Sequence, residues 1–248
     1  MKETRIIMGM PVTLDVVDKK INQEILDEVF EYFNYVDEKF STYKDTSEIS
    51  AINRGEINAD GYSEDMKIIF DLSEETKKVT SGYFDIHKKD GSYDTSGMVK
   101  GWAIFNAAKI LTNRGLENFY VEVAGDIQVS GHNSQGESWK IGIQNPFNKK
   151  QESVKTLHIQ NGGVATSGTY VRGDHIYNPK NNDSTANDIV SMTVIGPNIY
   201  EADRFATASF AMGKEGIHFI ESLEGFEGYM IDEKGIATMT SGFSVYTN

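Results

Sequence analysis

Hydrophobic residues recur at helical spacing in four long stretches of the chain. Residues 22–40 place apolar side chains every three or four positions, as an amphipathic helix does, and Asn22 is a plausible N-cap. The same periodicity predicts further long helices over 63–79, 98–113 and 199–212, and shorter helical segments at 47–53 and 214–223. Each of these helices is expected to bury one face.

Alternating and β-branched segments predict the strands. Residues 4–17 have the pattern of one strand, and the remaining strands are expected at 119–130, 138–144, 154–160 and 188–195, followed by a C-terminal hairpin of 226–231 with 236–241. Helices and strands are grouped along the chain instead of alternating strictly. This grouping favours an α+β fold with a mostly antiparallel sheet and flanking helices. Nothing marks a boundary, so we expect one domain over 1–248.

The charge of the chain narrows the classes of ligand. Its 248 residues carry a formal net charge of −13, which argues against nucleic-acid binding because that function needs a basic face. The same charge offers no long-range attraction to an anionic small molecule. If the chain binds such a ligand, local hydrogen-bond donors or a metal ion must overcome the overall field.

The absence of cysteine and of long apolar runs excludes several further classes. The chain has no cysteine, so it forms no disulfide, thiolate metal site or cysteine nucleophile. The N-terminal residues lack the apolar run of a signal peptide, and no stretch approaches the ~18 apolar residues of a membrane span. We expect a cytoplasmic protein as written, although an exported protein trimmed of its signal would have the same sequence.

The stretch "DTSGMVKG" places a lysine next to a glycine at the entrance of a predicted helix. We expect Lys100 in the first turn of that helix, where free N–H groups and the helix dipole favour an anion such as a phosphate. Gly97 allows the chain to turn and expose its carbonyl oxygen. The alternative interpretation is a surface lysine on a helix, with Asp94 as an ordinary turn residue.

The stretch "NIYEADRFATASFAMG" suggests oxygen ligands for a hard cation. Asn198 and Glu201 resemble a capping box, which places Asp203 and Thr207 inside the helix, four residues apart and on one face. A carboxylate with hydroxyl or carbonyl oxygens suits Mg²⁺, which keeps few protein ligands. The alternative is a hydrogen bond between Asp203 and Thr207 on a solvated face.

Two further stretches carry candidate chemistry. His175 lies between a turn and an extended segment, and histidine is the usual proton acceptor near neutral pH. Tyr83 and Phe84 are followed by Asp85 after a turn, so the rings either stack on a planar ligand or belong to the core. A structural histidine and a core aromatic pair remain open alternatives. Motifs such as HExxH and the P-loop are absent.

Taken in order, these stretches resemble the ApbE family, the FAD:protein FMN transferases. The resemblance covers nearly the whole chain, and seven motifs stand in register. They are "MGM" at 8–10, "FSTYKDTSEISAIN" at 40–53, "GYFD" at 82–85, "DTSGMVKGWA" at 94–103, "VEVAGDIQVSG" at 121–131, "ATSGTYVRGDHIYNP" at 165–179 and "EADRFATASFAMG" at 201–213. The resemblance implies the α+β fold of that family, which is related to the T-fold.

The resemblance also implies roles for individual residues. FAD contacts are implied at Met8, Tyr43, Tyr83, Phe84, Asp85, Asp94, Lys100 and Ile176. Magnesium ligation is implied at Gly97, through its carbonyl oxygen, and at Asp203 and Thr207. His175 and Asp203 are the implied catalytic residues, with His175 as the proton acceptor. The family reaction moves FMN from FAD onto a Ser or Thr hydroxyl of a target protein and releases AMP.

The sequence departs from the family pattern at three positions. Asn178 stands where the family has Asp before Pro, Ala124 replaces the first glycine of Gly-Gly-Asp, and Ser96 replaces a glycine. The Asn178 change bears most on transferase activity, because a carboxylate there can position the base. An FAD pyrophosphatase that uses water as nucleophile, and a non-catalytic FAD-binding protein, therefore stay open. The implied partners are FAD and a target protein that carries a flavinylation motif.

Overall fold

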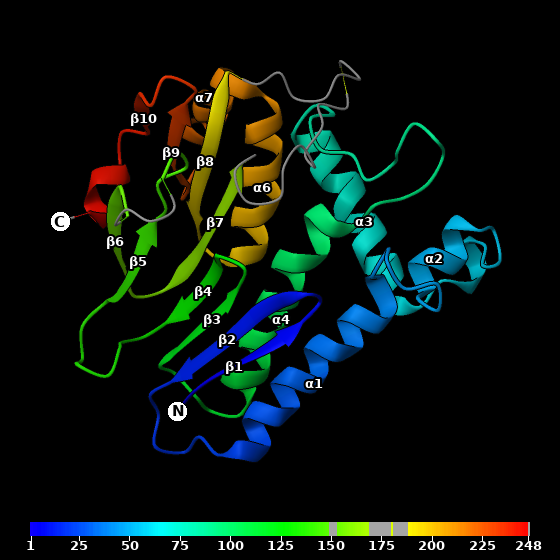
Figure 1. Cartoon of the computed structure of the whole chain (residues 1–248), viewed down its shortest axis with the longest axis horizontal. Helices are drawn as coiled ribbons and strands as arrows, with labels where there is room; N and C mark the ends of the chain where they lie inside the picture. The colour runs from blue at the N-terminus through cyan, green and yellow to red at the C-terminus, as the bar shows by residue number, and fades with distance from the viewer. Residues whose placement is uncertain (149–152, 169–179, 181–187, 248) are drawn as a thin grey trace.

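The computed structural model describes residues 1–148, 153–168, 180 and 188–247. Its centre is an antiparallel sheet in the order β1-β2-β3-β4-β7-β8-β9-β10 (Figure 1). The strands are β1 (Lys2–Ile7), β2 (Met10–Val16), β3 (Phe119–Val123), β4 (Asp126–Ser130), β7 (Gly162–Gly168), β8 (Ile189–Gly196), β9 (Glu227–Asp232) and β10 (Ala237–Met239). A separate antiparallel pair joins β5 (Trp139–Ile143) to β6 (Lys155–Ile159). The predicted α+β class with a mostly antiparallel sheet is confirmed.

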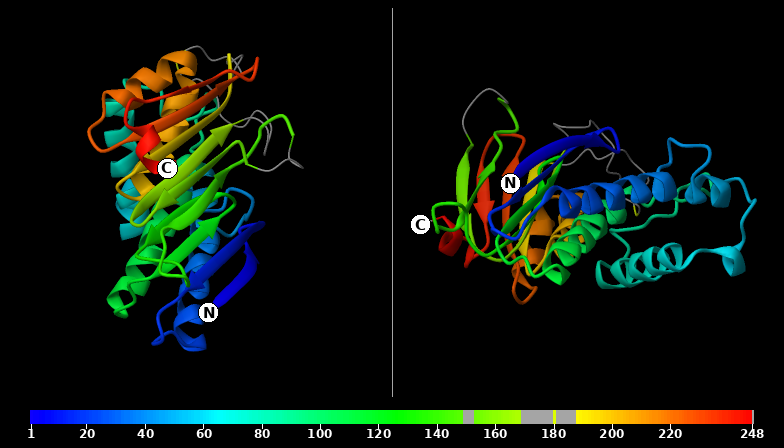
Figure 2. Two further views of the ribbon diagram at one scale, coloured as in Figure 1. Left: turned by 90° about the vertical axis from the view of Figure 1, so that its left-hand side faces the viewer. Right: turned by 90° about the horizontal axis from the view of Figure 1, so that it is seen from below.

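Helices cover one face of the large sheet, and the β5–β6 pair covers the other (Figure 2). The helices are α1 (Gln23–Phe40), α2 (Glu48–Asn53), α3 (Glu64–Val79), α4 (Ser96–Asn113), α6 (Ile199–Ala211) and α7 (Gly216–Glu221). Neighbouring strand residues alternate between the two sides: Ala165 joins the helix-facing core and Val164 the core under β5–β6. The sheet therefore has two buried faces over its middle strands.

The N-caps predicted at Asn22 and Asn198 are present, and Ser63 caps a third helix in the same way. The side chains of Asn22, Ser63 and Asn198 each accept a backbone N–H from the first turn of α1, α3 and α6, respectively. Glu201 does not complete a capping box, because its carboxylate pairs with Arg204 at 2.6 Å. In the described part of the chain, no helix combines the length and apolar character needed to cross a membrane.

Several predicted boundaries were wrong, and tight turns account for two of them. The single strand expected at 4–17 is the β1–β2 hairpin, turned by Met8 and Gly9 at φ 56° and 67°. The strand expected at 119–130 is likewise the β3–β4 hairpin, turned by Ala124 and Gly125 at φ 51° and 93°. Two successive residues at positive φ form the turn whose twist suits adjacent antiparallel strands. The turn places Asp126 at the first position of β4.

Two further differences affect the candidate site. Strand β7 was not predicted, because its sequence "GGVATSG" is rich in glycine. A Cβ at Gly163 would lie 2.1 Å from the backbone nitrogen of Ile199, so glycine there lets α6 begin directly against the sheet. Helix α4 starts at Ser96, which puts Lys100 in its second turn and not in the first turn as predicted.

Candidate functional site

The candidate site forms where α4 crosses α6. A Cβ at Gly101 would lie 2.7 Å from the Cβ of Asp203 and 3.0 Å from the carbonyl oxygen of Ile199, so the two helices approach too closely there for any other residue. The Gly101 N–H donates to Oδ2 of Asp203 at 2.8 Å. This contact fixes the carboxylate in the helix interface.

In the described part of the chain, three charged side chains meet beside this crossing. The Lys100 ammonium contacts Oδ2 of Asp126 and lies 3.9 Å from Oδ1 of Asp203. The other oxygen of Asp126, Oδ1, accepts the Thr166 N–H at 3.2 Å. Both carboxylates are buried, with 1% of Asp126 and 4% of Asp203 exposed. The cluster thus joins α4, β4 and α6, with its backbone support from β7.

Asp126 was not among the site residues predicted from the sequence. It is the aspartate of "VAGDI", directly after the β3–β4 turn, and only the fold brings it to Lys100. The available signal was a buried position on a predicted strand occupied by a carboxylate, since such residues are rarely buried without a charged partner.

With both carboxylates ionised, the cluster carries more negative than positive charge. Burial raises the pKa of Asp203 to about 7, and the nearby Asp126 carboxylate adds to the rise, against the lowering effects of the Lys100 ammonium and the Gly101 N–H. Two carboxylates share one ammonium in a place with little access to water. A bound cation would relieve this excess of negative charge.

The predicted metal ligands come together at the same crossing. A Cβ at Gly97 would lie 3.6 Å from Cγ2 of Thr207, and Asp203 contacts Gly101, one turn along α4 from Gly97. In a regular helix, the Gly101 N–H donates to the Gly97 carbonyl oxygen. Here the same N–H donates to Asp203, so the Gly97 oxygen can still bind a cation. A carbonyl, a carboxylate and a hydroxyl form a hard donor set that fits Mg²⁺.

Acidic ligands alone would not identify this site. Among the residues that the structure describes, no group of three or more His, Cys, Asp or Glu side chains is arranged to hold a metal ion. The candidate set at Gly97, Asp203 and Thr207 instead combines one carboxylate with two neutral oxygens. Its fit to a cation depends on the excess negative charge supplied by Asp126.

Asp94 does not pair with Lys100. Its Oδ2 lies 3.0 Å from the Lys88 ammonium, and its Oδ1 accepts the Ser96 N–H at 3.0 Å, just before α4 begins. Burial acts to raise the pKa of Asp94, but the hydrogen bonds from Ser96 and Lys88 outweigh it and hold that pKa below its usual range. Asp94 therefore orders the entrance of α4, while Lys100 belongs to the Asp126–Asp203 cluster.

The aromatic residues predicted to bind FAD occupy different environments. Phe84 is buried, and its ring would lie 3.4 Å from a Cβ at Gly97, so it packs behind the candidate metal site. The ring of Tyr83 is covered by the Lys180 ammonium at 4.1 Å, and Asp85 pairs with Lys77 at 2.7 Å. Tyr43, in the loop between α1 and α2, is 97% exposed.

The remaining residues with a predicted role are Met8, His175 and Ile176, and only Met8 is among the described residues. Met8 lies in the β1–β2 turn and packs partly against the main core. His175 and Ile176 lie outside the described residues, as does Asn178. The roles that the resemblance implies for these residues stay predictions.

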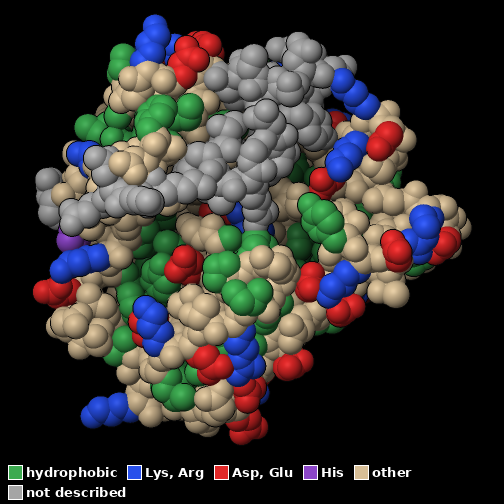
Figure 3. All heavy atoms as spheres, in the orientation of Figure 1, with side chains coloured by type: hydrophobic (Ala, Val, Ile, Leu, Met, Phe, Trp, Pro, Cys, Tyr) green, Lys and Arg blue, Asp and Glu red, His purple; other side chains and the backbone are tan. Residues whose placement is uncertain are grey.

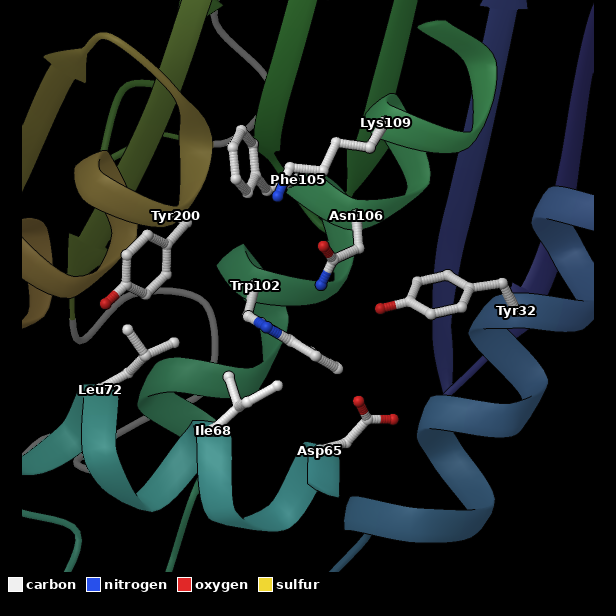
Figure 4. Close-up of a pocket in the computed structure, with 9 residues that line it drawn as sticks. All are labelled: Tyr32, Asp65, Ile68, Leu72, Trp102, Phe105, Asn106, Lys109 and Tyr200. Carbon is white, nitrogen blue, oxygen red and sulfur yellow. The ribbon is translucent and has the colours of Figure 1, made fainter. Parts of the chain in front are cut away.

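A cavity lies on the face of α4 opposite to Lys100. It encloses about 420 Å³ between α1, α3, α4 and α6, with Trp102 near its centre (Figure 4). It is lined by Tyr32, Asp65, Ile68, Leu72, Trp102, Phe105, Asn106, Lys109 and Tyr200. The α4 members recur at three- and four-residue spacing on the side away from Lys100. Of the described residues predicted to bind FAD or metal, none lines this cavity.

Known proteins with similar sequences belong to one family. The ApbE family model matches residues 8–90 and 87–230. The FAD:protein FMN transferase of Escherichia coli K12 is 29% identical over 150 residues, which are 57% of this chain and 43% of that protein. The FAD:protein FMN transferase of Vibrio cholerae is 33% identical over 130 residues, 49% of this chain and 39% of that protein. The matched region thus spans less than half the length of these curated relatives.

Solved structures share the fold over the whole chain. The flavin transferase ApbE from Vibrio cholerae superposes with a TM-score of 0.86 at 22% identity, covering 99% of this chain and 98% of that one. The ApbE protein from Thermotoga maritima gives a TM-score of 0.88 at 21% identity, covering 100% and 99%. Because the family model matches most of the sequence, this chain belongs to the ApbE family.

Proposed function

We propose that this chain transfers FMN from FAD to a Ser or Thr hydroxyl of a target protein and releases AMP. The observation that carries the proposal is the buried cluster of Lys100, Asp126 and Asp203, beside Gly97 and Thr207. The Lys100 ammonium can bind phosphate oxygens, and the neighbouring oxygen atoms can bind a metal ion. The curated relatives named FAD:protein FMN transferase support the same reaction.

Mg²⁺ would be held by the Gly97 carbonyl, the Asp203 carboxylate and the Thr207 hydroxyl. When bound, the ion supplies Lewis-acid stabilisation of the negative charge on the pyrophosphate oxygens. The Gly101 N–H keeps the Asp203 carboxylate in place, and Phe84 packs behind Gly97. These contacts would hold the proposed metal ligands in place.

The transfer forms one phosphorus–oxygen bond and breaks another. The hydroxyl oxygen of the target attacks the phosphorus atom of the FMN half of FAD, and the bond from that phosphorus to the AMP phosphate breaks. The Lys100 ammonium donates to the anionic phosphate oxygens. The hydroxyl proton passes to a base, for which His175 is the candidate from the family resemblance. FAD itself is bound by Met8, Tyr43, Tyr83, Phe84, Asp85, Asp94, Lys100 and Ile176.

Mass spectrometry of a target peptide tests the proposal. The chain is incubated with FAD, Mg²⁺ and a peptide of the form Asp-Gly-x-x-Thr-Gly-Ala-Thr. A second peptide with both Thr residues replaced by Ala serves as the control. A covalent FMN adduct on the first peptide alone supports transfer. Free FMN and AMP without an adduct would indicate a pyrophosphatase. Quenching of FAD fluorescence with neither product would indicate a binding protein.

A further inference from the structure

Asp126 is fixed both in its main chain and, through one backbone hydrogen bond, at its carboxylate. Asp126 directly follows the tight Ala124–Gly125 turn and pairs with Val123 of the neighbouring strand β3. Oδ1 accepts the Thr166 N–H from β7 at 3.2 Å, and only 1% of the residue is exposed. A short side chain fixed in this way has little freedom to follow a partner.

Lys100, in contrast, can reach either carboxylate of the cluster. Its flexible stem rises from α4, and its side chain is 21% exposed, against 2% for Asp126 and 6% for Asp203. The ammonium contacts Oδ2 of Asp126 and stays 3.9 Å from Oδ1 of Asp203. The position of the Asp126 carboxylate therefore determines where the Lys100 ammonium lies.

We propose that Asp126 is a positioning residue that draws the Lys100 ammonium away from Asp203 and so keeps the Asp203 carboxylate available to a divalent cation. The proposal rests on the proposed function, because it assumes the cation site at Gly97, Asp203 and Thr207. Asp126 also supplies the second negative charge of the cluster. With both carboxylates ionised, the cluster carries a net charge of −1 and attracts a cation.

Replacing Asp126 by Asn changes both properties. The amide keeps the shape of the side chain but no longer competes for the ammonium as an anion. Lys100 then has Asp203 as its remaining anionic partner in the cluster, and attraction between opposite charges is strong where water is largely excluded. The ammonium would occupy the carboxylate that the cation needs. Removing the Lys100 charge as well should free Asp203 again.

The experiment measures binding of Mn²⁺ alone to the full chain without FAD, by loss of the free-ion signal in electron paramagnetic resonance. Mn²⁺ accepts the same oxygen ligands as Mg²⁺. Four proteins are compared: wild type, Asp126→Asn, the double variant Asp126→Asn with Lys100→Met, and the control Glu122→Gln on the neighbouring strand β3. Circular dichroism checks the fold of each. If Asp126→Asn fails to fold, the smaller neutral variant Asp126→Ser replaces it.

We expect Asp126→Asn to raise the Mn²⁺ dissociation constant at least tenfold, Glu122→Gln to leave it unchanged, and the double variant to recover most of the loss. A merely structural role for Asp126 would not give that recovery. Equal affinity in wild type and Asp126→Asn would overturn the proposal while leaving the cation site in place. A double variant no better than Asp126→Asn would overturn the positioning role. Absence of Mn²⁺ binding to wild type would overturn the cation site and this proposal together.

Discussion

Gly97 and Gly101 lie one turn apart on α4, yet the space around them differs. A Cβ at Gly97 would meet Phe84 at 3.4 Å and Thr207 at 3.6 Å, which are ordinary contact distances. A Cβ at Gly101 would lie 2.9 Å from Oδ2 of Asp203 and closer still to its Cβ. The sequence pattern pointed to Gly97 as the glycine that lets the chain turn and expose its carbonyl oxygen, and it did not indicate a close helix contact at Gly101. The structure places such a contact at Gly101.

Alanine at each glycine should separate these two roles. We expect Gly101→Ala to reduce the free energy of unfolding by about 1–3 kcal/mol through overpacking and to abolish tight cation binding by displacing Asp203. Gly97→Ala should leave stability unchanged or raise it by up to ~1 kcal/mol, because alanine favours the helix. Urea denaturation of both variants measures the difference. Similar losses at both positions would contradict the helix packing described above.

The buried Asp203 carboxyl should make the stability of the metal-free chain depend on pH. Burial raises its pKa from 3.8 to about 7, so between these values the folded chain keeps a proton that the unfolded chain has released. Stability is therefore lost as pH rises through this window, and the loss levels off above the folded pKa. Asp203→Asn removes the effect. In EDTA, the unfolding free energy of wild type minus that of the variant should fall between pH 5 and 8.

A matched variant guards against a general charge effect. Asp60→Asn changes one exposed carboxylate in the same way, and its difference from wild type should show no such decline. A flat profile for the Asp203→Asn comparison would mean that the folded chain does not disfavour the ionised form of Asp203. The excess of negative charge inferred for the cluster would then be wrong.

At the scale of elements, long amphipathic helices were predictable and tight hairpins were not. Helices α1 and α3 combine sustained periodicity with Asn and Ser caps, which fix their starts. The turns of β1–β2 and β3–β4 use Met8 and Ala124 at positive φ, where glycine or asparagine is the usual signal. The hydrophobic pattern therefore runs through them unbroken. A pattern of residue types cannot reveal a backbone conformation that tertiary contacts impose.

The candidate site was predictable where its residues lie close in sequence and not where the fold joins them. Asp203 and Thr207 share one helix face, so their spacing pointed to a common site. Asp126 has no neighbour in sequence that marks it, because its partners stand on α4 and β7. The pairing of Asp94 with Lys88 was missed for the same reason. Local periodicity carries no information on which strand lies beneath which helix.

The β3–β4 turn offers a test at this scale. Ala124→Gly should raise the unfolding free energy by about 0.5–1 kcal/mol, because φ 51° is strained for alanine by about 1–2 kcal/mol and glycine loses part of that gain to chain entropy. Gly125→Ala should lower it by about 1–2 kcal/mol, because φ is 93° there. Thermal or urea unfolding of the two variants measures both values. Effects of the same sign would show that the turn is not built as described.

At the scale of the whole molecule, the net charge of −13 opposes the binding of an anionic ligand. On the face shown in Figure 3, the described acidic and basic side chains are interspersed, and the described residues form no large basic patch there. Among the residues that the structure describes, the positive charge that the candidate site offers to a phosphate is the ammonium of Lys100, which already lies beside two carboxylates. The long-range field and the local donor would therefore act in opposite directions on FAD, the ligand of the proposed reaction.

Salt should separate these two contributions to FAD binding. In EDTA, with no metal to compensate, raising ionic strength from ~0.01 to ~0.15 M shortens the Debye length from about 30 to about 8 Å and screens the repulsion between FAD and the surface. We expect the FAD association rate, followed by quenching of flavin fluorescence in stopped flow, to rise several-fold. Lys100→Met should keep this salt dependence while weakening affinity, because the short-range bond is screened less. An association rate that falls with salt would mean that a positive local field governs FAD capture despite the acidic surface.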